Sequence, residues 1–456
     1  MNLSSGYITT LVFVPSKLVK IFKQGTEGEN VTTHLPGTND LQPSLEDLWS
    51  RYVRSVVEHG VGLIPGQDLY IRVMAHARES ALRAGETAYD LGAAQVHYRI
   101  IDMEEQAQLI RRARGTTVVE ATQVHIRSWY LEILRSRSPL LVLSEIGPSN
   151  HYERLARDYP DNHRLFLQGL SDIGLSYMRQ AVDLGQSACT ITPAPSASWA
   201  TRIFPDLPAS MAEQKLLELL VPLVDLTPEE LLSRREKDRE RSHRLEALQI
   251  RELQVTGGGN DFRVRLPETA RWIHTSGLQT KSGQRYYLNF PSEEVYTTPD
   301  FRYTTGRLVA SRPFRLGNGV RVEGAVLEFE DGQVVKSSAT VGAADLEQAL
   351  ATDEGARRLG EFALVSSDSP LARSQHFFDH ILLDENAGSH VALGNGWKMA
   401  FGVDPLDDEI ALESQGLNRS AIHTDIVFGS PEVTISASDS IQGEVVLLDG
   451  GSWRLS

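Results

Sequence analysis

The sequence predicts an α/β N-terminal domain built on a parallel sheet, followed by an α+β C-terminal domain. A strand, helix, strand succession at residues 64–101 predicts the first, and a change to short strands and turns beyond about residue 250 predicts the second. The chain has 456 residues, more than the roughly 250–300 at which a single hydrophobic core stops growing. We therefore expect two domains, at residues 1–245 and 246–456.

The N-terminal elements are marked by capping and turn residues. Ser44, with an acid three residues later, predicts the start of a helix, and Gly60 its end. A turn feeding a strand at 64–71, a helix at 78–92 and a second strand at 95–101 then follow. This succession is typical of a crossover between parallel strands. No glycine-rich phosphate loop follows the first strand, which argues against a nucleotide-binding domain.

The middle of the chain combines a loop-like segment with a charged helix. Pro193–Pro208 is rich in proline, alanine and serine, and predicts a loop. Thr227, followed by a proline and two glutamates, predicts the start of a long helix. The mixed charges of Arg234–Arg241 favour a solvated helix face with ion pairs over a nucleic-acid-binding helix. We expect this helix to end near Gln249.

Composition excludes several classes of function. The 45 lysines and arginines against 60 acids give a net charge of −15, whereas nucleic-acid binding requires a basic surface. Cys189 is the only cysteine, so an intramolecular disulfide and a thiolate zinc cluster are both impossible. The apolar stretch Ile8–Val14 is too short to span a bilayer and lacks the features of a signal peptide. We predict a cytoplasmic protein that binds neither nucleic acid nor membrane.

Candidate metal ligands occur in four short segments of the C-terminal half. Glu293 and Glu294 are adjacent in a strand-like segment, so only one of them can face a given site. Glu361 stands at the start of an apolar run, where a charge is costly unless it is paired or bound to a cation. Each segment taken alone is better explained by ordinary surface polarity or a helix-end acid than by a metal site.

The other two segments add histidines to the carboxylates. Glu385 and His390 lie in a short polar span between apolar stretches. His423 and Asp425 are two apart in a predicted strand, so their side chains share one face and could clamp a cation. Carboxylates and imidazoles in this proportion suit a pair of divalent ions such as zinc, manganese or cobalt better than a closed tetrahedral site.

A pair of histidines provides an alternative zinc motif. His376 and His380 are four residues apart, but the glutamate of the usual His-Glu-x-x-His motif is missing. We therefore interpret them as a structural or surface pair.

Over almost its whole length the chain resembles the aminopeptidase T family of thermophilic and staphylococcal metallo-aminopeptidases. Several long motifs carry the resemblance, and they occur in the same order: Ile64–Gln67, Phe204–Asp206, Asn289–Tyr296, Thr352–Glu361, Asp384–His390 and Asn418–Asp425.

The resemblance implies a metal-dependent aminopeptidase that removes N-terminal amino acids from peptides, with a water activated by two divalent metals. The implied ligands are Glu294, Glu361, Glu385, His390, His423 and Asp425, with Glu361 as the bridging residue. Glu293 and Glu361 are the candidates for the proton acceptor, and the choice between Glu293 and Glu294 as ligand is open. A homodimer and substrates with a free amino terminus are also implied.

One position departs from the family pattern. Seven residues after the matching histidine the family carries a tyrosine, where this chain has Trp397. Indole has a single N–H donor and no acidic hydroxyl, and the loss of one oxyanion donor costs ~10²–10³ in turnover. The second hypothesis is therefore a diverged metallo-hydrolase acting on an amide or peptide intermediate of a specialised small-molecule pathway. A non-catalytic binding protein is disfavoured because all six ligand positions are filled.

Overall fold

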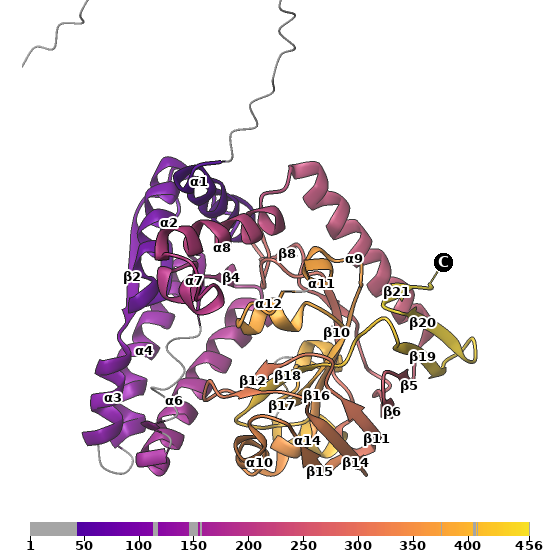
Figure 1. Cartoon of the computed structure of the whole chain (residues 1–456). Helices are drawn as coiled ribbons and strands as arrows, with labels where there is room; N and C mark the ends of the chain where they lie inside the picture. The colour runs from indigo at the N-terminus through magenta and orange to yellow at the C-terminus, as the bar shows by residue number, and fades with distance from the viewer. Residues whose placement is uncertain are drawn as a thin grey trace, which may run out of the picture. The chain divides into compact units, whose positions relative to one another are not determined.

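The computed structural model describes residues 43–112, 117–145, 154–155, 157–374, 376–404, 407 and 409–455 (Figure 1). These residues belong to one compact unit, Pro43–Ser456. The apolar stretch Ile8–Val14 lies outside the described residues. Among the helices within these ranges, none is both long and apolar enough to cross a membrane.

The N-terminal part contains the predicted parallel sheet. Its strand order is β2-β1-β3-β4, and every neighbouring pair is parallel. The strands are β1 (Leu69–Met74), β2 (Val96–Ile101), β3 (Leu140–Ser144) and β4 (Cys189–Pro193). The expectation of a parallel sheet at this end of the chain is confirmed.

Helices pack around this sheet, and the capping residues set where they begin. The Ser44 hydroxyl accepts a hydrogen bond from the backbone N–H of Asp47 at 3.1 Å, as the sequence predicts. The first helix continues as a single π-helical turn that ends at Gly60. The helices of this part are α1 (Leu45–Ser55), η1 (Val56–Gly60), η2 (Ala75–Ala77), α2 (Arg78–Asp90), α3 (Met103–Arg112), α4 (Thr117–Ser136), α6 (Pro160–Met178), η3 (Arg179–Asp183) and α8 (Ala209–Val224).

The predicted loop at Pro193–Pro208 is wrong in its centre, where the structure has the helix α7 (Ala197–Ile203). Ser196 caps this helix, because its hydroxyl accepts a hydrogen bond from the backbone N–H of Trp199 at 3.1 Å. Trp199 is fully buried in the N-terminal core. A local cap and a tertiary contact outweigh the loop-like composition.

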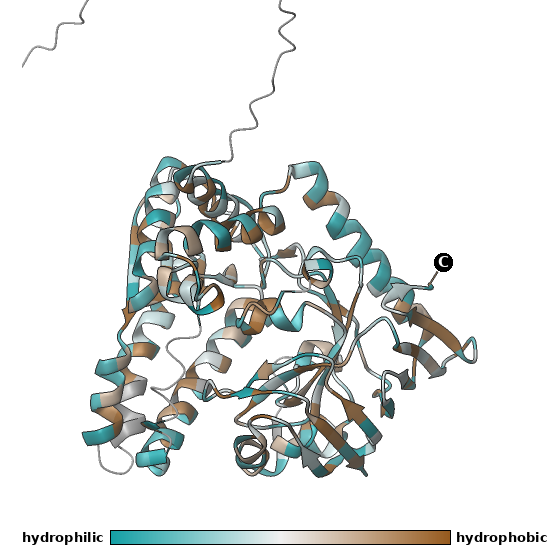
Figure 2. Cartoon of the chain, in the orientation of Figure 1, coloured by the Kyte–Doolittle hydropathy of each residue, from teal (hydrophilic) through white to brown (hydrophobic). Residues whose placement is uncertain are grey.

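Helix α9 (Pro228–Leu248) joins the N-terminal part to the remainder. Thr227 and Glu230 form a capping box, and Gln249 ends the helix with a left-handed φ of 48°. The helix is largely hydrophilic in Figure 2, and its charges pair along the surface, as in the Arg244–Glu240 contact of 2.5 Å. The predicted domain limit at residues 245/246 falls in its last turn, and remains a prediction.

The C-terminal part is built on two larger antiparallel sheets. One has the order β18-β17-β16-β10-β7 and the other β15-β14-β11-β6-β5-β19-β20-β21. The strands of the first are β7 (Ile273–His274), β10 (Glu294–Thr297), β16 (Leu359–Val365), β17 (His390–Gly394) and β18 (His423–Val427). The second contains β5 (Glu252–Gly257), β6 (Asn260–Arg265), β11 (Thr305–Val309), β14 (Val326–Glu330), β15 (Gln333–Ser338), β19 (Thr434–Asp439), β20 (Val445–Asp449) and β21 (Ser452–Trp453).

Short elements complete this part. They are β8 (Leu278–Gln279), β9 (Arg285–Tyr286), η4 (Phe301–Tyr303), β12 (Phe314–Arg315), β13 (Arg321–Val322), α10 (Ala343–Leu350), η5 (Glu354–Arg357), α11 (Pro370–Ser374), α12 (Ile381–Glu385), α13 (Lys398–Phe401) and α14 (Glu409–Gln415).

One hydrophobic core lies between the two antiparallel sheets. The first sheet contributes Val295, Phe362, Leu364, Val391, Leu393 and Ile426, and the second Leu253, Phe262, Leu308 and Leu327. Because side chains alternate along a strand, the residues between these apolar ones face the other side of the first sheet. That other side carries the candidate site.

Candidate metal centre

The predicted ligands occupy the face of the five-stranded sheet that points away from this core. They alternate with the core residues along four adjacent strands: Glu294 on β10, Glu361 on β16, His390 on β17, and His423 and Asp425 on β18. A small residue separates two of them: Ala392 pairs with Glu361 on one neighbouring strand and with Asp425 on the other. The alanine leaves space on the sheet surface where larger side chains would fill it.

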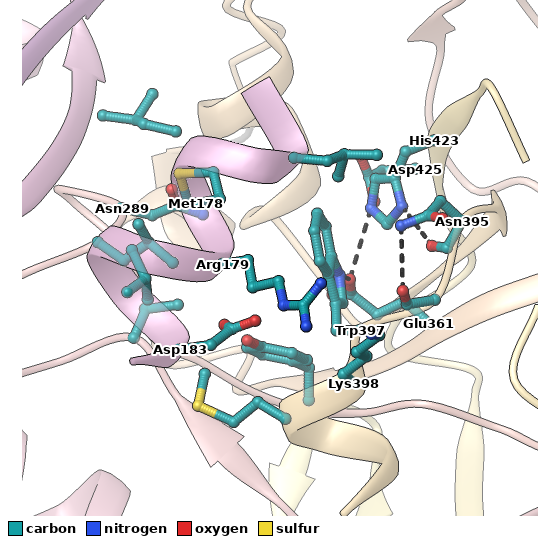
Figure 3. Close-up of a pocket in the computed structure, with 18 of the residues that line it drawn as sticks. Met178, Arg179, Asp183, Asn289, Glu361, Asn395, Trp397, Lys398, His423 and Asp425 are labelled. Atoms are coloured by element: carbon teal, nitrogen blue, oxygen red, sulfur yellow. Dashed lines mark hydrogen bonds and ion pairs between the residues drawn. The ribbon is translucent and has the colours of Figure 1, made fainter. Parts of the chain in front are cut away.

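Glu361 lies between the two imidazoles, and Figure 3 shows it beside His423. Its carboxylate oxygens are 3.8 Å from Nε2 of His390 and 3.4 Å from Nε2 of His423. Nε2 of His390 is also 3.4 Å from Glu294, and Nε2 of His423 is 3.4 Å from Asp425. Ligand atoms of Glu294, Glu361 and His390 all lie within 4.8 Å of one another, so three side chains could contact a common ion.

Glu385 completes the set from the end of α12. It lines the same pocket as Glu294, Glu361, His423 and Asp425. Besides burial, the carboxylate of Asp425 lies close enough to raise the pKa of Glu385. The structure thus brings all six predicted ligands together.

Backbone carbonyls fix the orientation of both imidazoles. Nδ1 of His390 is 3.1 Å from the carbonyl oxygen of Gly388, and Nδ1 of His423 is 3.0 Å from that of Asn395. A carbonyl only accepts, so each Nδ1 must donate, and each Nε2 is left to face the carboxylates. This is the arrangement typical of metal-binding histidines.

The pKa values of the cluster reflect crowded, buried carboxylates. Burial raises the pKa of Glu294 to about 7, although His390 opposes it. Burial and the nearby charge of Asp425 raise the pKa of Glu385 well above its ordinary value. For Glu361, burial is outweighed by hydrogen bonds from the two imidazoles, and its pKa falls to about 2. The carboxylates of Glu361, Glu294 and Asp425 outweigh the effect of burial and raise the pKa of His390 to about 9.

These properties fit a divalent cation. The Oε2 atom of Glu294 is buried and has no hydrogen-bond partner among the described residues, which is costly for a carboxylate oxygen. A cation would satisfy it and would replace the protons that the crowded acids otherwise retain. A set rich in oxygen with two imidazole nitrogens matches zinc, manganese and cobalt.

Glu293 points away from this cluster. Its carboxylate forms an ion pair of 2.9 Å with Arg234 of α9, and it does not line the pocket. Adjacent residues on a strand face opposite sides, so Glu294 and Glu293 cannot both reach the site. We therefore do not retain Glu293 as a proton acceptor, and Glu294 is the better candidate ligand.

Trp397 directs its only polar atom at Glu361. The indole Nε1 donates a hydrogen bond of 2.5 Å to Oε2 of that carboxylate, and the ring packs on His423 with 5.0 Å between centroids. The backbone N–H of Trp397 donates to the hydroxyl of Thr298 at 3.0 Å, which fixes the residue in place. The neighbouring Lys398 ammonium donates to the carbonyl of Asp407 at 2.7 Å.

Comparison with known proteins agrees with this geometry. Residues 45–453 match the thermophilic metalloprotease family, M29. The chain belongs to the M29 metalloprotease family. It is 30% identical over 406 residues to aminopeptidase T of Thermus aquaticus, covering 86% of this chain and 95% of the relative. It is 27% identical over 407 residues to aminopeptidase 2 of Geobacillus stearothermophilus, covering 88% of this chain and 97% of the relative.

A solved structure shares the fold of this M29 chain. Wild-type AmpT from Thermus thermophilus superposes with a TM-score of 0.74 at 27% identity, covering 90% of this chain and 100% of the other. The predicted relationship to aminopeptidase T is confirmed, and so is the prediction of a hydrolase acting on peptide bonds.

Other reactive side chains of this M29 chain have structural roles. His380 is buried, with Nε2 at 2.8 Å from the carbonyl oxygen of Ser144, whereas His376 is exposed. Cys189 is also buried, and burial raises the pKa of its thiol to about 12. The buried His380 and the exposed His376 agree with their interpretation as a structural or surface pair.

The cluster opens into a pocket of about 550 Å³. Its far wall comes from the N-terminal part, through residues such as Met178, Arg179 and Asp183. In Figure 3 these residues lie on the helix that faces His423 and Asp425. Sequence analysis missed this wall, although polar residues at helical spacing from Asp172 to Arg179 were a usable signal.

Proposed function

We propose that the chain is an aminopeptidase that holds two divalent metal ions through Glu294, Glu361, Glu385, His390, His423 and Asp425. One observation carries the proposal: Glu361 lies between two imidazoles whose Nε2 atoms also face Glu294 and Asp425. The names of the relatives, aminopeptidase T and aminopeptidase 2, support the substrate class.

When bound, two such ions lower the pKa of water from about 15.7 to about 7 and polarise the scissile carbonyl. The residues around the ions would hold them in position. Glu361 is the candidate bridging ligand because its two oxygens face different histidines. Of the two proton-acceptor candidates from the sequence, Glu293 is held by Arg234, and the low pKa of Glu361 makes it a weak base.

Groups behind the ligands preserve this arrangement. The carbonyls of Gly388 and Asn395 hold the imidazoles with Nε2 toward the cluster. The indole N–H of Trp397 holds one oxygen of Glu361. The pocket admits the end of a peptide and excludes folded proteins, because its volume of about 550 Å³ is that of a small-ligand site.

Metal analysis combined with peptide hydrolysis tests the proposal. We expect chelation to abolish hydrolysis of leucine p-nitroanilide, and zinc, manganese or cobalt to restore it at two ions per chain. N-acetylation of the substrate should prevent cleavage, because an aminopeptidase requires a free amine. Glu361→Gln should lose metal and activity, whereas Glu293→Gln, a matched control at a glutamate that points away from the cluster, should retain both. Full activity with both ions in Glu361→Gln would refute the assignment.

A diverged metallo-hydrolase of a small-molecule pathway is the second candidate. It is favoured by Trp397, whose single donor is already directed at Glu361 and is not available to a substrate oxygen. This candidate predicts normal metal content with no cleavage of free dipeptides or amino-acyl anilides.

The remaining features of the proposal concern the state of the protein in the cell. We propose a homodimer, as the family resemblance implies, and a cytoplasmic location, as the N-terminal sequence predicts. Light scattering of the purified protein would measure the assembly, and a monomer at micromolar concentration would contradict it.

A further inference from the structure

The pocket wall that faces the ligand cluster has a polar helix face. Asp172, Leu175, Ser176 and Arg179 follow the i, i+3, i+4, i+7 spacing of one helix face along α6 and η3, and all line the pocket. The π-helical turn η3 contributes Arg179 and Asp183. Such turns are rare and frequently occur at functional sites.

The positively charged guanidinium of Arg179 lies on this wall. Its side chain is partly buried and extends into the pocket (Figure 3). Within the described part of the chain, no hydrogen bond or ion pair ties its guanidinium to another residue. A guanidinium has five N–H donors in a planar fork. Partial burial keeps water from some of these donors, so a hydrogen-bond acceptor on a bound substrate would stabilise the side chain.

We propose that Arg179 binds a carboxylate of the substrate, either the C-terminal carboxylate of a short peptide or an acidic side chain next to the scissile bond. This inference rests on the proposed peptidase function. Guanidinium and carboxylate groups pair through two parallel hydrogen bonds, which gives both affinity and orientation. The pocket volume of about 550 Å³ limits such a substrate to a few residues.

Asp183 is the competing acid on the same wall, and no ion pair joins it to Arg179. Burial raises the pKa of Asp183 to about 6, against the attraction of Lys398 and Arg179. With this pKa the carboxyl group is mostly ionised at neutral pH, so it competes with a substrate carboxylate for the guanidinium. Asp183→Asn removes this charge and is therefore expected to tighten binding of an anionic substrate.

Substrate pairs that differ only in one carboxylate test this inference on the full-length, metal-loaded protein. Leu-Ala is compared with Leu-Ala amide for the C-terminal carboxylate, and Leu-Asp amide with Leu-Asn amide for the side chain. We expect one pair to show a preference of about 10–100-fold in KM for the carboxylate form, as for a hydrogen-bonded charge pair. Arg179→Met should abolish this preference, and Arg179→Lys should retain part of it.

Control variants and a binding measurement separate the possible failures. Arg164→Met, on the exposed side of α6 with its ion pair to Asp161, should leave the preference unchanged. Uncharged Leu-Ala amide reports peptidase activity itself, and the control Arg164→Met should cleave it within about twofold of the unmodified protein. If no peptide is cleaved, calorimetric binding of reduced-bond Leu-Ala analogues with and without the carboxylate decides the question independently. Absence of a carboxylate preference, or its persistence in Arg179→Met, overturns the inference.

Discussion

Replacing Trp397 by phenylalanine tests whether the indole N–H supports the metal centre. The substitution removes the 2.5 Å hydrogen bond to Glu361 but keeps an aromatic ring to pack on His423. A hydrogen bond to a charged group contributes about 1.5–3 kcal/mol, which corresponds to about 10–100-fold in an equilibrium constant. Loss of a group that orients a metal ligand lowers metal affinity by a similar factor.

We therefore expect Trp397→Phe to bind zinc or manganese about 10–100-fold more weakly than the unmodified protein. Calorimetric titration of metal into the chelated protein measures this directly, and hydrolysis of leucine p-nitroanilide at saturating metal measures what activity remains. Trp453→Phe is the control, because Trp453 lies on β21 in the other sheet. Unchanged metal affinity together with unchanged turnover would refute the reasoning.

Three further substitutions test other parts of the structure. Burial raises the pKa of Asp238 from 3.8 to about 6, so the folded state binds more protons than the unfolded state. The free energy of unfolding therefore falls as pH rises between about 4 and 6, by at most about 3 kcal/mol. Urea unfolding of Asp238→Asn across this range should lack that slope. Asp379 pairs with Arg202 at 2.9 Å and with Arg315 at 2.5 Å. Asp379→Asn, which tolerates the φ of 56°, should lower the free energy of unfolding by about 3–5 kcal/mol because the largely buried Arg315 loses its carboxylate partner. Ala392→Leu fills the space between two proposed ligands, and elemental analysis should find its metal content reduced at least tenfold while circular dichroism shows a folded protein.

Local rules predicted the helix boundaries well where a side chain makes its own cap. The capping boxes at Ser44 and Thr227 begin helices where the sequence places them. The same rules failed at Pro193–Pro208, because the burial of Trp199 and the cap at Ser196 are not visible in composition. Composition reports an average tendency, whereas a helix of seven residues depends on individual contacts.

Only part of the candidate site could be predicted from local pattern. The two-residue spacing of His423 and Asp425 places them on one face of a strand, and the alternation rule separates Glu293 from Glu294. The meeting of β10, β16, β17 and β18 depends on sheet order, which residue spacing does not contain. For the proposed ligands, family resemblance supplied that information.

The pocket wall opposite the metal centre was not predicted because it is contributed from far away in the sequence. Arg179 follows a long helix, and Glu361 lies some 180 residues later. No local signal joins them. The hydrogen bond from Trp397 to Glu361 was equally hidden, since the sequence shows the exchange of one aromatic residue but not the direction of its N–H.

The alternation along the five-stranded sheet makes its strands intolerant of insertion or deletion. Val391 packs in the core, and its neighbour His390 belongs to the proposed metal centre. A shift of β17 by one residue would exchange them, placing an imidazole among aliphatic side chains and a valine in the pocket. Folding errors in register and losses of catalysis would then arise from the same event, and changes in chain length can be accommodated only in the connections beyond the strand ends.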